Sequence, residues 1–532
     1  MKQGKFLVLV GIILIGALLR LLWLNKFPAG FTPDEASFGY NAYSLLKTGK
    51  DEWGIPFWQL PYNNLRSFGD YKMPLYAILT VPSVAVFGLN EFSTRLPNAL
   101  LGSLTVLVIY ALVIRTTNSK LYAEFAALLI ALSPWAIPLS RGAFEANLIT
   151  FFLTLATVLF FSHRFAISYA LFALCLYTYH SSRIIVPLAL FSLFIIFKPK
   201  ISKSLLLLLI SLPAIYSFIF FNQRALDVSI FHPDDNFAAM ASRRLELINS
   251  GWPAPAAKLI SNKLNNALPV FFSNYISYFT PKFLFSNGPA EATYGMLPDH
   301  GVLYWVQLPV ILLFMYKVIK KSNHYELFAI CLLLISPIPA ALSKGPGFAA
   351  NRAAFMIIPL TIITTIGMAQ LVKFTTKYLL FAFILLLFVS GSIYIQKYVT
   401  KSSIVHSRSM GFGYKSLSLY LNEAIPQFDQ IRVSRLLSES QAYYAFYAKY
   451  PPRDFQSATR SWTQFENLGF RFLDQYDGYF LGNIRFGDLN LERHDKGKIL
   501  YIGRPDDFPK NTNYQIISAY PDSTPAIVSL FP

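Results

Sequence analysis

The chain has 532 residues, of which 54% are hydrophobic, 16% aromatic and only 14% charged. Because a soluble domain carries about 25% charged residues, this composition excludes an ordinary soluble enzyme, a disordered chain and a disulfide-stapled scaffold. The net charge of +18 fits the Lys and Arg that gather in cytoplasmic loops of membrane proteins. Cys175 and Cys331 both lie in apolar stretches, which predicts buried thiols. The sequence therefore predicts a polytopic membrane protein.

Apolar segments of about the length that crosses the hydrocarbon core recur along the chain. They lie near 6–24, 95–114, 121–139, 147–163, 165–180, 184–198, 204–221, 303–317, 325–342, 353–371 and 378–396. The first lacks a small-residue cleavage site, so we expect a retained helix and not a signal peptide. The stretch 75–88 contains Pro82, and we expect it to lie as a helix at the outer surface. The predicted fold is α-helical, with about 11–13 transmembrane helices.

Basic residues occupy alternate short loops, and this pattern predicts their orientation. The loops with few acids hold Arg115, Lys120, Arg164, Lys198, Lys200, Lys203, Lys317, Lys320, Lys321, Lys373 and Lys377. Lys and Arg collect on the cytoplasmic side, so these loops and the amino terminus, with Lys2 and Lys5, are predicted to be cytoplasmic. The same alternation places the loops 25–94 and 222–302 and the region 400–532 outside.

The chain divides into a predicted membrane domain, 1–399, and a predicted extracytoplasmic α/β domain, 400–532. The terminal region contains a helical pattern, YKSLSLYLNEAI, and short strand-like segments: QIRVSR, GYFLGNIRF, KILYIGR, YQIISAY and AIVSLF. Strands alternating with helices indicate an α/β domain. In the loop 222–302, the periodicity of 258–279 predicts an amphipathic helix at the outer surface, followed by a cover over the site.

Charged residues near membrane depth are costly, so those that persist are functional candidates. In this sequence they gather at the outer ends of spans and in the outer loops. The candidates are Asp34 and Glu35, Asp70, Tyr71 and Lys72, Arg141 and Glu145, His180 and Arg183, His300, and Arg352. The cations suit an anionic ligand such as a phosphate, and the carboxylates suit a general base or a metal. Beside a membrane, this combination points to a lipid-phosphate substrate.

Each candidate also has a structural interpretation. The Asp34–Glu35 pair could cap a helix, and Lys72 could extend its charge to the interface. Arg141 and Glu145 stand at i, i+4 and could pair with each other. His180 lies among the tyrosines of a membrane belt, and the two later arginines could contact lipid headgroups. Only the coincidence of these residues on one face favours a site.

The early sequence then resembles a known family. The segments PDEASFGYNAYSLLKTG, YKMPLY and FGLNEFSTRLPNALLGSLTVLVIYAL are similar to those of bacterial GT-C membrane glycosyltransferases. The resemblance is to the branch that includes protein O-mannosyltransferases and the lipid A aminoarabinose transferase, and it covers roughly residues 1–400. The family segment K-P-P-L corresponds to Lys72-Met73-Pro74-Leu75, with methionine replacing the first proline.

The resemblance implies a function: inverting transfer of a sugar from a polyprenyl-phosphate donor to an acceptor hydroxyl outside the cytoplasm, in a bacterial cell membrane. It places Asp34 and Glu35 in the catalytic role and Lys72 near the donor phosphate. Arg141, Arg183 and Arg352 are further candidates to bind that phosphate, and Asp70, Tyr71, Glu145, His180 and His300 to bind substrate. Some relatives bind a divalent ion. The sequence shows no compact ligand motif, so we assign no metal site, and a divalent metal stays an open alternative. The acceptor is a protein, a lipid or a wall glycan, and no nucleic acid is expected.

Two other classes of function remain as alternatives. A polyprenyl-lipid or glycolipid transporter would show inverted repeats and polar sites at the midplane, whereas no internal repeat is evident and the charges gather at one rim. An anchored binding protein would recognise a wall polymer through its outer domain, but would not need many spans with polar outer ends.

Overall fold

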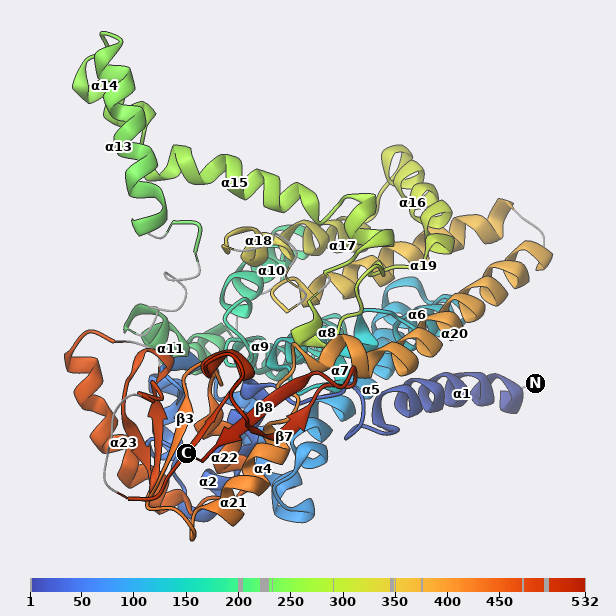
Figure 1. Ribbon diagram of the computed structural model, residues 1–532. Coiled ribbons are helices and arrows are strands. Elements are labelled where there is room, and N and C mark those ends of the chain that lie inside the picture. Colours follow the sequence, from blue (N-terminus) through green and yellow to red (C-terminus); the bar gives the residue numbers. More distant parts are fainter. Residues whose placement is uncertain are drawn as a thin grey trace.

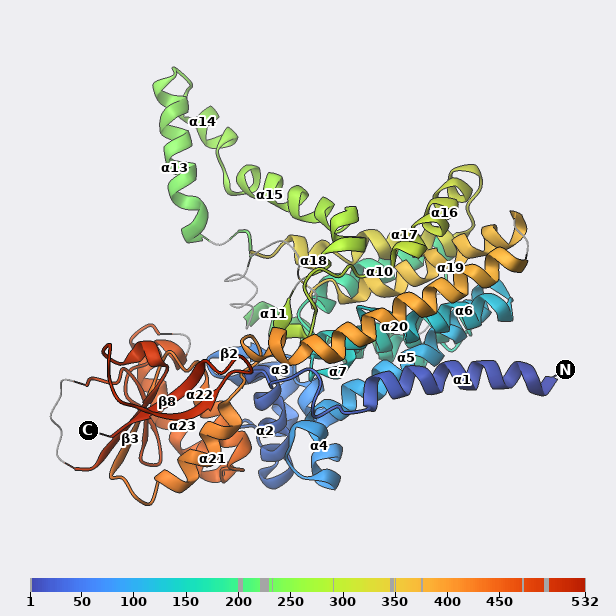
Figure 2. The same cartoon turned by 45° about the vertical axis from the view of Figure 1, so that its right-hand side comes forward.

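The computed structural model describes residues 2–199, 204–220, 229–231, 233–289, 291–344, 349, 351–374, 377–470, 473–491 and 497–531. These residues form a bundle of apolar helices with a sheet-containing unit at one end (Figures 1 and 2). This arrangement confirms the predicted class, a helical membrane protein with a C-terminal α/β domain.

Every predicted span overlaps a helix of the bundle. These helices are α1 (Lys2–Leu21), α5 (Glu91–Thr117), α6 (Lys120–Ala131), α7 (Ala136–Arg141), α8 (Leu148–Phe161), α9 (Phe165–Cys175), α10 (Ser182–Phe197), α11 (Ser204–Phe220), α16 (Leu308–Lys320), α17 (His324–Ile335), α18 (Ile338–Ala341), α19 (Ile357–Phe374) and α20 (Lys377–Ser407). Within the described residues, four helical stretches are long and apolar enough to cross a membrane: Glu91–Thr117, His324–Ala341, Ala354–Val372 and Tyr378–Ser407. Five other apolar helices are shorter.

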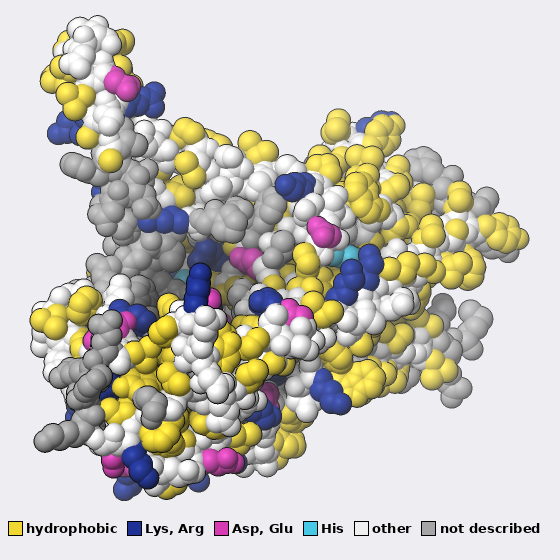
Figure 3. Space-filling model, in the orientation of Figure 1, with side chains coloured by type: hydrophobic (Ala, Val, Ile, Leu, Met, Phe, Trp, Pro, Cys, Tyr) yellow, Lys and Arg dark blue, Asp and Glu magenta, His cyan; other side chains and the backbone are white. Residues whose placement is uncertain are grey.

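Apolar side chains cover the outer surface of this bundle, as its membrane assignment requires. Figure 3 shows them over α16 and α20. Among them, Leu312 and Ile319 of α16 and Phe381 and Leu385 of α20 are more than half exposed. Surface on this scale would be unfavourable in water, and a bilayer removes that cost.

The first outer loop folds into four short elements. These are α2 (Pro33–Thr48), α3 (Leu60–Asn63), the antiparallel hairpin β1 (Leu65–Ser67) with β2 (Asp70–Lys72), and α4 (Leu75–Phe87). The sequence Thr-Pro-Asp-Glu starts α2 because Thr32 and Glu35 form a capping box and Pro33 suits the first helical position. The helix predicted at 75–88 is α4, whereas the hairpin was not predicted.

The second long loop forms an arm that stands away from the bundle (Figure 1). It contains α13 (Pro233–Asn249), α14 (Ala254–Ile260) and α15 (Lys263–Ser277). Residues 222–228, 232 and 290 of this predicted loop lie outside the described part. The predicted amphipathic helix is α15. Its apolar side chains at i, i+4 spacing are exposed: Leu264, Leu268, Phe272 and Ile276. This stripe suits a membrane surface, and that position of α15 stays a prediction.

The C-terminal region builds a six-stranded sheet in the order β4-β5-β3-β6-β8-β7. The strands are β3 (Gln430–Ser434), β4 (Tyr479–Leu481), β5 (Ile484–Gly487), β6 (Ile499–Gly503), β7 (Gln515–Ala519) and β8 (Pro525–Leu530), and the helices are α21 (Tyr414–Ala424), α22 (Ser440–Tyr447) and α23 (Pro452–Asn467). The central strands β5, β3 and β6 are parallel. All predicted strand segments are confirmed, and YKSLSLYLNEAI forms α21. The predicted domain boundary at 399/400 falls inside α20.

This sheet-containing unit packs directly on α2. The Tyr443 hydroxyl on α22 donates to the Phe31 carbonyl (2.7 Å), and the Phe31 and Phe446 rings lie 4.8 Å apart. On α23, the Gln456 amide donates to Ser44 Oγ of α2 (3.1 Å). The helix that carries the predicted catalytic pair is therefore held by residues more than 350 positions later in the sequence.

Candidate active site

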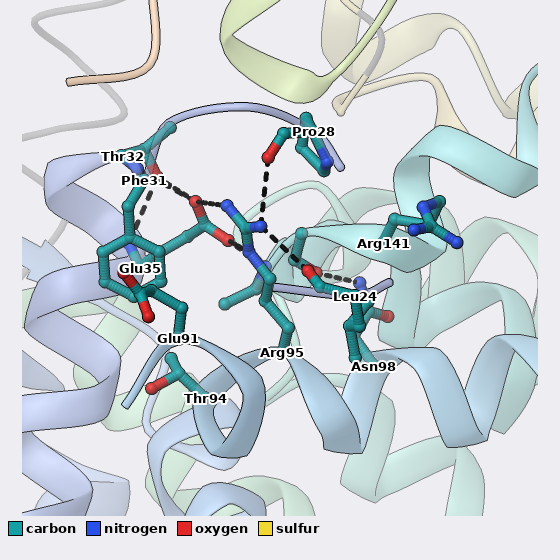
Figure 4. Close-up of polar contacts among 12 residues, drawn as sticks. Leu24, Pro28, Phe31, Thr32, Glu35, Glu91, Thr94, Arg95, Asn98 and Arg141 are labelled. Carbon is teal, nitrogen blue, oxygen red and sulfur yellow. Dashed lines mark hydrogen bonds and ion pairs between the residues drawn. The ribbon is translucent and has the colours of Figure 1, made fainter. Parts of the chain in front are cut away.

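The start of α2 is fixed by a buried ion pair. The Arg95 guanidinium, from α5, donates to Glu35 Oε1 from Nε (2.7 Å) and to Glu35 Oε2 from Nη2 (3.1 Å), and both side chains are fully buried (Figure 4). The guanidinium also donates to the carbonyls of Leu24, Pro28 and Gly30. Glu35 accepts further bonds from the Thr32 and Ala143 amides. Both Glu35 oxygens are thus occupied within the protein, which positions α2.

Asp34, the neighbour of Glu35, points to another partner. Lys72 Nζ lies 2.5 Å from Asp34 Oδ1; the lysine side chain is 1% exposed and the aspartate side chain 30%. The ammonium also lies over the Phe68 ring, 4.1 Å from its centroid. The hairpin positions Lys72, and Met73 directly after it is buried. The structure therefore brings an outer carboxylate against this lysine, with the carboxylate at the accessible end.

Further ionisable groups surround the Asp34–Lys72 pair. Glu145 is buried just before α8, and burial together with the charge of Asp34 raises its pKa to about 8. Tyr179 interacts electrostatically with Arg352, Glu145, Glu291 and Asp34. Two carboxylates close together disfavour ionisation of both, which favours the protonated form of Glu145.

An apolar cavity of about 200 Å³ opens beside this cluster. His180, Arg183 and Arg352 line it together with Phe218 and Phe231. His180 Nε2 bonds the Tyr71 carbonyl (2.8 Å). Arg183 Nη2 donates to Asn64 Oδ1 (3.3 Å), and Asn351 Nδ2 donates to the Tyr179 hydroxyl (2.8 Å). Two guanidinium groups thus line a largely apolar space.

Three of the predicted site residues have other surroundings. The Arg141 guanidinium donates to the carbonyls of Leu19 (2.6 Å) and Leu22 (2.7 Å) at the end of α1, and it points away from the Glu35–Arg95 pair (Figure 4). Its i, i+4 neighbour Glu145 is not its partner in these bonds. His300 bonds the Gly301 carbonyl (2.9 Å) and packs 4.6 Å from the Tyr394 ring of α20. Asp70 is buried, and its Oδ1 accepts from the Tyr71 amide (2.8 Å).

The structure also adds residues that the sequence analysis missed. Arg95 is the first residue of a predicted span. A lone arginine at the outer end of an apolar helix is costly, and this feature could have identified Arg95 as a candidate. Glu291 and Tyr294 belong to the predicted cover, and Tyr294 interacts electrostatically with Tyr179, Asp34 and Glu145. No local sequence pattern identifies Glu291 and Tyr294, because only the return of the chain brings them near the Asp34–Lys72 pair. In the described part of the chain, no group of three His, Cys, Asp or Glu residues is arranged to hold a metal.

Comparisons with known proteins find similar sequences and structures. Residues 10–174 match the family model described as dolichyl-phosphate-mannose-protein mannosyltransferase. Two solved structures of ArnT from Cupriavidus metallidurans cover 99% of this chain and 98% of their own, at 12% identity: the apo state with a TM-score of 0.54 and the state bound to undecaprenyl phosphate with 0.53. The chain has the GT-C fold. The family match confirms the resemblance predicted from the early sequence.

Curated relatives match the chain over shorter regions. An uncharacterized protein of Aquifex aeolicus (strain VF5) is 30% identical over 159 residues, which are 30% of each chain. The "Putative mannosyltransferase YkcB" of Bacillus subtilis (strain 168) is 40% identical over 86 residues, 16% of this chain and 12% of that protein. The chain thus matches less than a third of the length of either relative. The apolar helices of the bundle and the family match over residues 10–174 indicate an integral membrane protein.

Proposed function

We propose that this GT-C protein transfers a sugar from a polyprenyl-phosphate donor to an acceptor hydroxyl on the outer side of the membrane, with inversion at the anomeric carbon. The observation that carries the proposal is the Asp34–Lys72 pair: a buried ammonium touches a carboxylate that is 30% exposed. In such a pair the ammonium can bind a phosphate and the carboxylate can accept a proton. Glu35 positions α2 in this proposal, because Arg95, Thr32 and Ala143 already occupy its oxygens.

The cavity beside the pair suits the donor lipid. Arg183 and Arg352 supply guanidinium groups for a phosphate, and Phe218 and Phe231 supply apolar walls. A polyprenyl phosphate combines these two chemistries in one molecule. Undecaprenyl phosphate is also the ligand named in one of the ArnT structures, which supports the same donor class here.

The proposed reaction is a single displacement. Asp34 accepts the proton of the acceptor hydroxyl, the hydroxyl oxygen bonds to the anomeric carbon, and the bond from that carbon to the phosphate oxygen breaks. The phosphate carries away the electron pair, and Lys72 and Arg352 stabilise its growing negative charge. A donor phosphate beside Lys72 also competes with Asp34 for the ammonium, so donor binding would free the carboxylate to act as the base.

Membranes that contain the wild type, Asp34→Asn or Asp454→Asn test this proposal. Asp454 lies exposed on α23 and is the matched control. Each sample is incubated with a panel of polyprenyl-phosphate sugars, and the released polyprenyl phosphate is measured by mass spectrometry. We expect turnover by the wild type and Asp454→Asn only. No release by folded wild type, combined with movement of the intact lipid across a bilayer, would support a transporter.

The proposal includes an orientation and a domain division. The helix ends with Arg115, Lys120, Lys317 and Lys320 carry the basic charge, and the amino terminus lies at the opposite end of the molecule from the C-terminal sheet (Figure 2). The positive-inside rule then puts the amino terminus in the cytoplasm and the region 400–532 outside a bacterial cell membrane. Cysteines introduced singly at Lys120 and Asp454 test this: in intact cells, only the second should react with a membrane-impermeant maleimide.

A further inference from the structure

A second hollow lies in the C-terminal unit, at the carboxyl ends of its parallel strands. It has a volume of about 650 Å³ and is bordered by residues that follow β3, β5 and β6, which is within the roughly 300–1,000 Å³ of small-molecule sites. From β3 the chain continues to β4 and β5 on one side, whereas from β6 it continues to β7 and β8 on the other. In open α/β sheets, ligands bind where the connections diverge in this way. We call this hollow the strand-end crevice.

The polar groups of the strand-end crevice are held in fixed positions. Ser434 Oγ donates to Asp507 Oδ1 (2.9 Å), and the Arg504 amide donates to Asp507 Oδ2 (2.7 Å). Arg435 Nη2 donates to Asp488 Oδ2 (2.5 Å). A carboxylate offers about four acceptor sites, so Asp507 retains acceptor capacity toward the crevice. A preorganised set of donors and acceptors loses little entropy when it binds a ligand.

The chemistry of the lining selects a class of ligand. The lining contains one guanidinium, that of Arg435, and two carboxylates, those of Asp488 and Asp507, so it does not favour a phosphate or an acidic peptide. The exposed Asn490 amide adds a donor and an acceptor, and Leu436, 52% exposed, adds an apolar contact. A sugar ring matches this mixture, because its hydroxyl groups both donate and accept and its C–H faces are apolar. We propose that the strand-end crevice binds a neutral carbohydrate chain.

The position of the crevice connects it with the transfer reaction. It opens at the carboxyl edge of the sheet, from which β3 leads into α22, and Tyr443 of α22 bonds to Phe31 just before α2. At the end of β7 on the same edge, Arg408 pairs with Asp522 (2.5 Å). This edge therefore faces the helical bundle. The inference deepens the proposed function and in part rests on it, since a glycan held in the crevice would be the acceptor or a part of it. Binding of the glycan to the crevice requires no donor.

Ligand-observed NMR on the full chain in lipid nanodiscs tests the inference. The neutral probes are mannotriose, chitotriose and arabinotriose, and inorganic triphosphate is the anionic probe. We expect saturation transfer to at least one neutral probe. Asp507→Asn should weaken that binding by about tenfold, the loss of one charge-assisted hydrogen bond. Asn490→Gly should also weaken it, and this variant keeps the positive φ of 50° at this position without strain.

Glu423→Gln is the matched control, because Glu423 lines a separate groove at the opposite edge of the sheet; its binding should equal that of the wild type. No saturation transfer to any neutral probe, binding of triphosphate alone, or equal binding by all variants would each overturn the inference. Release of polyprenyl phosphate is measured in the same samples. Donor turnover without glycan binding removes only the crevice assignment, whereas glycan binding without turnover of any donor removes only the proposed transferase.

Discussion

The roles of the two adjacent acids of α2 can be separated by comparing Glu35→Gln with Asp34→Asn. Glu35 and Arg95 are fully buried and joined by two hydrogen bonds. Removing one partner of a buried ion pair costs about 3–5 kcal/mol, because it leaves the other charge uncompensated. Asp34 is 30% exposed, so water reaches the carboxylate of its pair with Lys72. A partly exposed pair contributes only about 1 kcal/mol or less.

The assay combines stability and turnover. We expect Glu35→Gln to lower the midpoint of thermal unfolding of the purified protein and to reduce donor turnover in proportion to the fraction of folded protein. Asp34→Asn should unfold near the wild-type temperature and lose turnover. Combining Glu35→Gln with Arg95→Met should cost less than the sum of the single changes, because the second change removes the unpaired charge.

Two results would refute this reasoning. If Glu35→Gln unfolds like the wild type but loses all turnover, then Glu35 and not Asp34 takes the proton. If Asp34→Asn keeps wild-type turnover, the exposed carboxylate is not the base, and the proposed mechanism fails at its central step.

The other predictions concern the phosphate, the pH profile and the packing of α2. Lys72→Met should lower donor turnover by at least about 100-fold, the usual effect of removing one group that stabilises the leaving charge, and a folded variant with near-normal kcat would contradict this. Burial raises the pKa of Glu145 to about 8, so above that pH it adds a negative charge beside Asp34 and the KM for the donor should rise. In Glu145→Gln this rise should be absent. A rise that persists in this variant would exclude Glu145 as its source. Gly39→Ala should push α2 away from its neighbours, since the new Cβ would lie 2.4 Å from Phe446 Cε2. We expect the free energy of unfolding to fall by about 1–3 kcal/mol and a protease to cleave faster between the helical bundle and the C-terminal unit. Wild-type resistance to the protease would show that the contact can adjust.

The membrane helices and the strands followed directly from the sequence. Long apolar runs can form stable backbone hydrogen bonds in lipid only as helices. Composition alone therefore predicted the span 378–396, which lies within α20, and the span 353–371, which overlaps α19. The segments of the C-terminal sheet were equally clear, because β-branched and aromatic residues alternate there between turn residues. Asp34 and Lys72 were selected as candidates because the cost of charge near a membrane makes such residues conspicuous.

The partners of these charged residues were decided only by the tertiary structure. The adjacent acids Asp34 and Glu35 look alike in the sequence, yet one faces Lys72 and the other is buried against Arg95. Arg141 looked like a phosphate ligand, but the carbonyls at the end of α1 occupy its guanidinium. Such pairings join segments that lie far apart in the chain. The sequence by itself determined which segments form apolar helices and where charge gathers, because local hydrophobicity and period set both. Only packing of the helices and the terminal sheet decided which carboxylate stays accessible to a substrate.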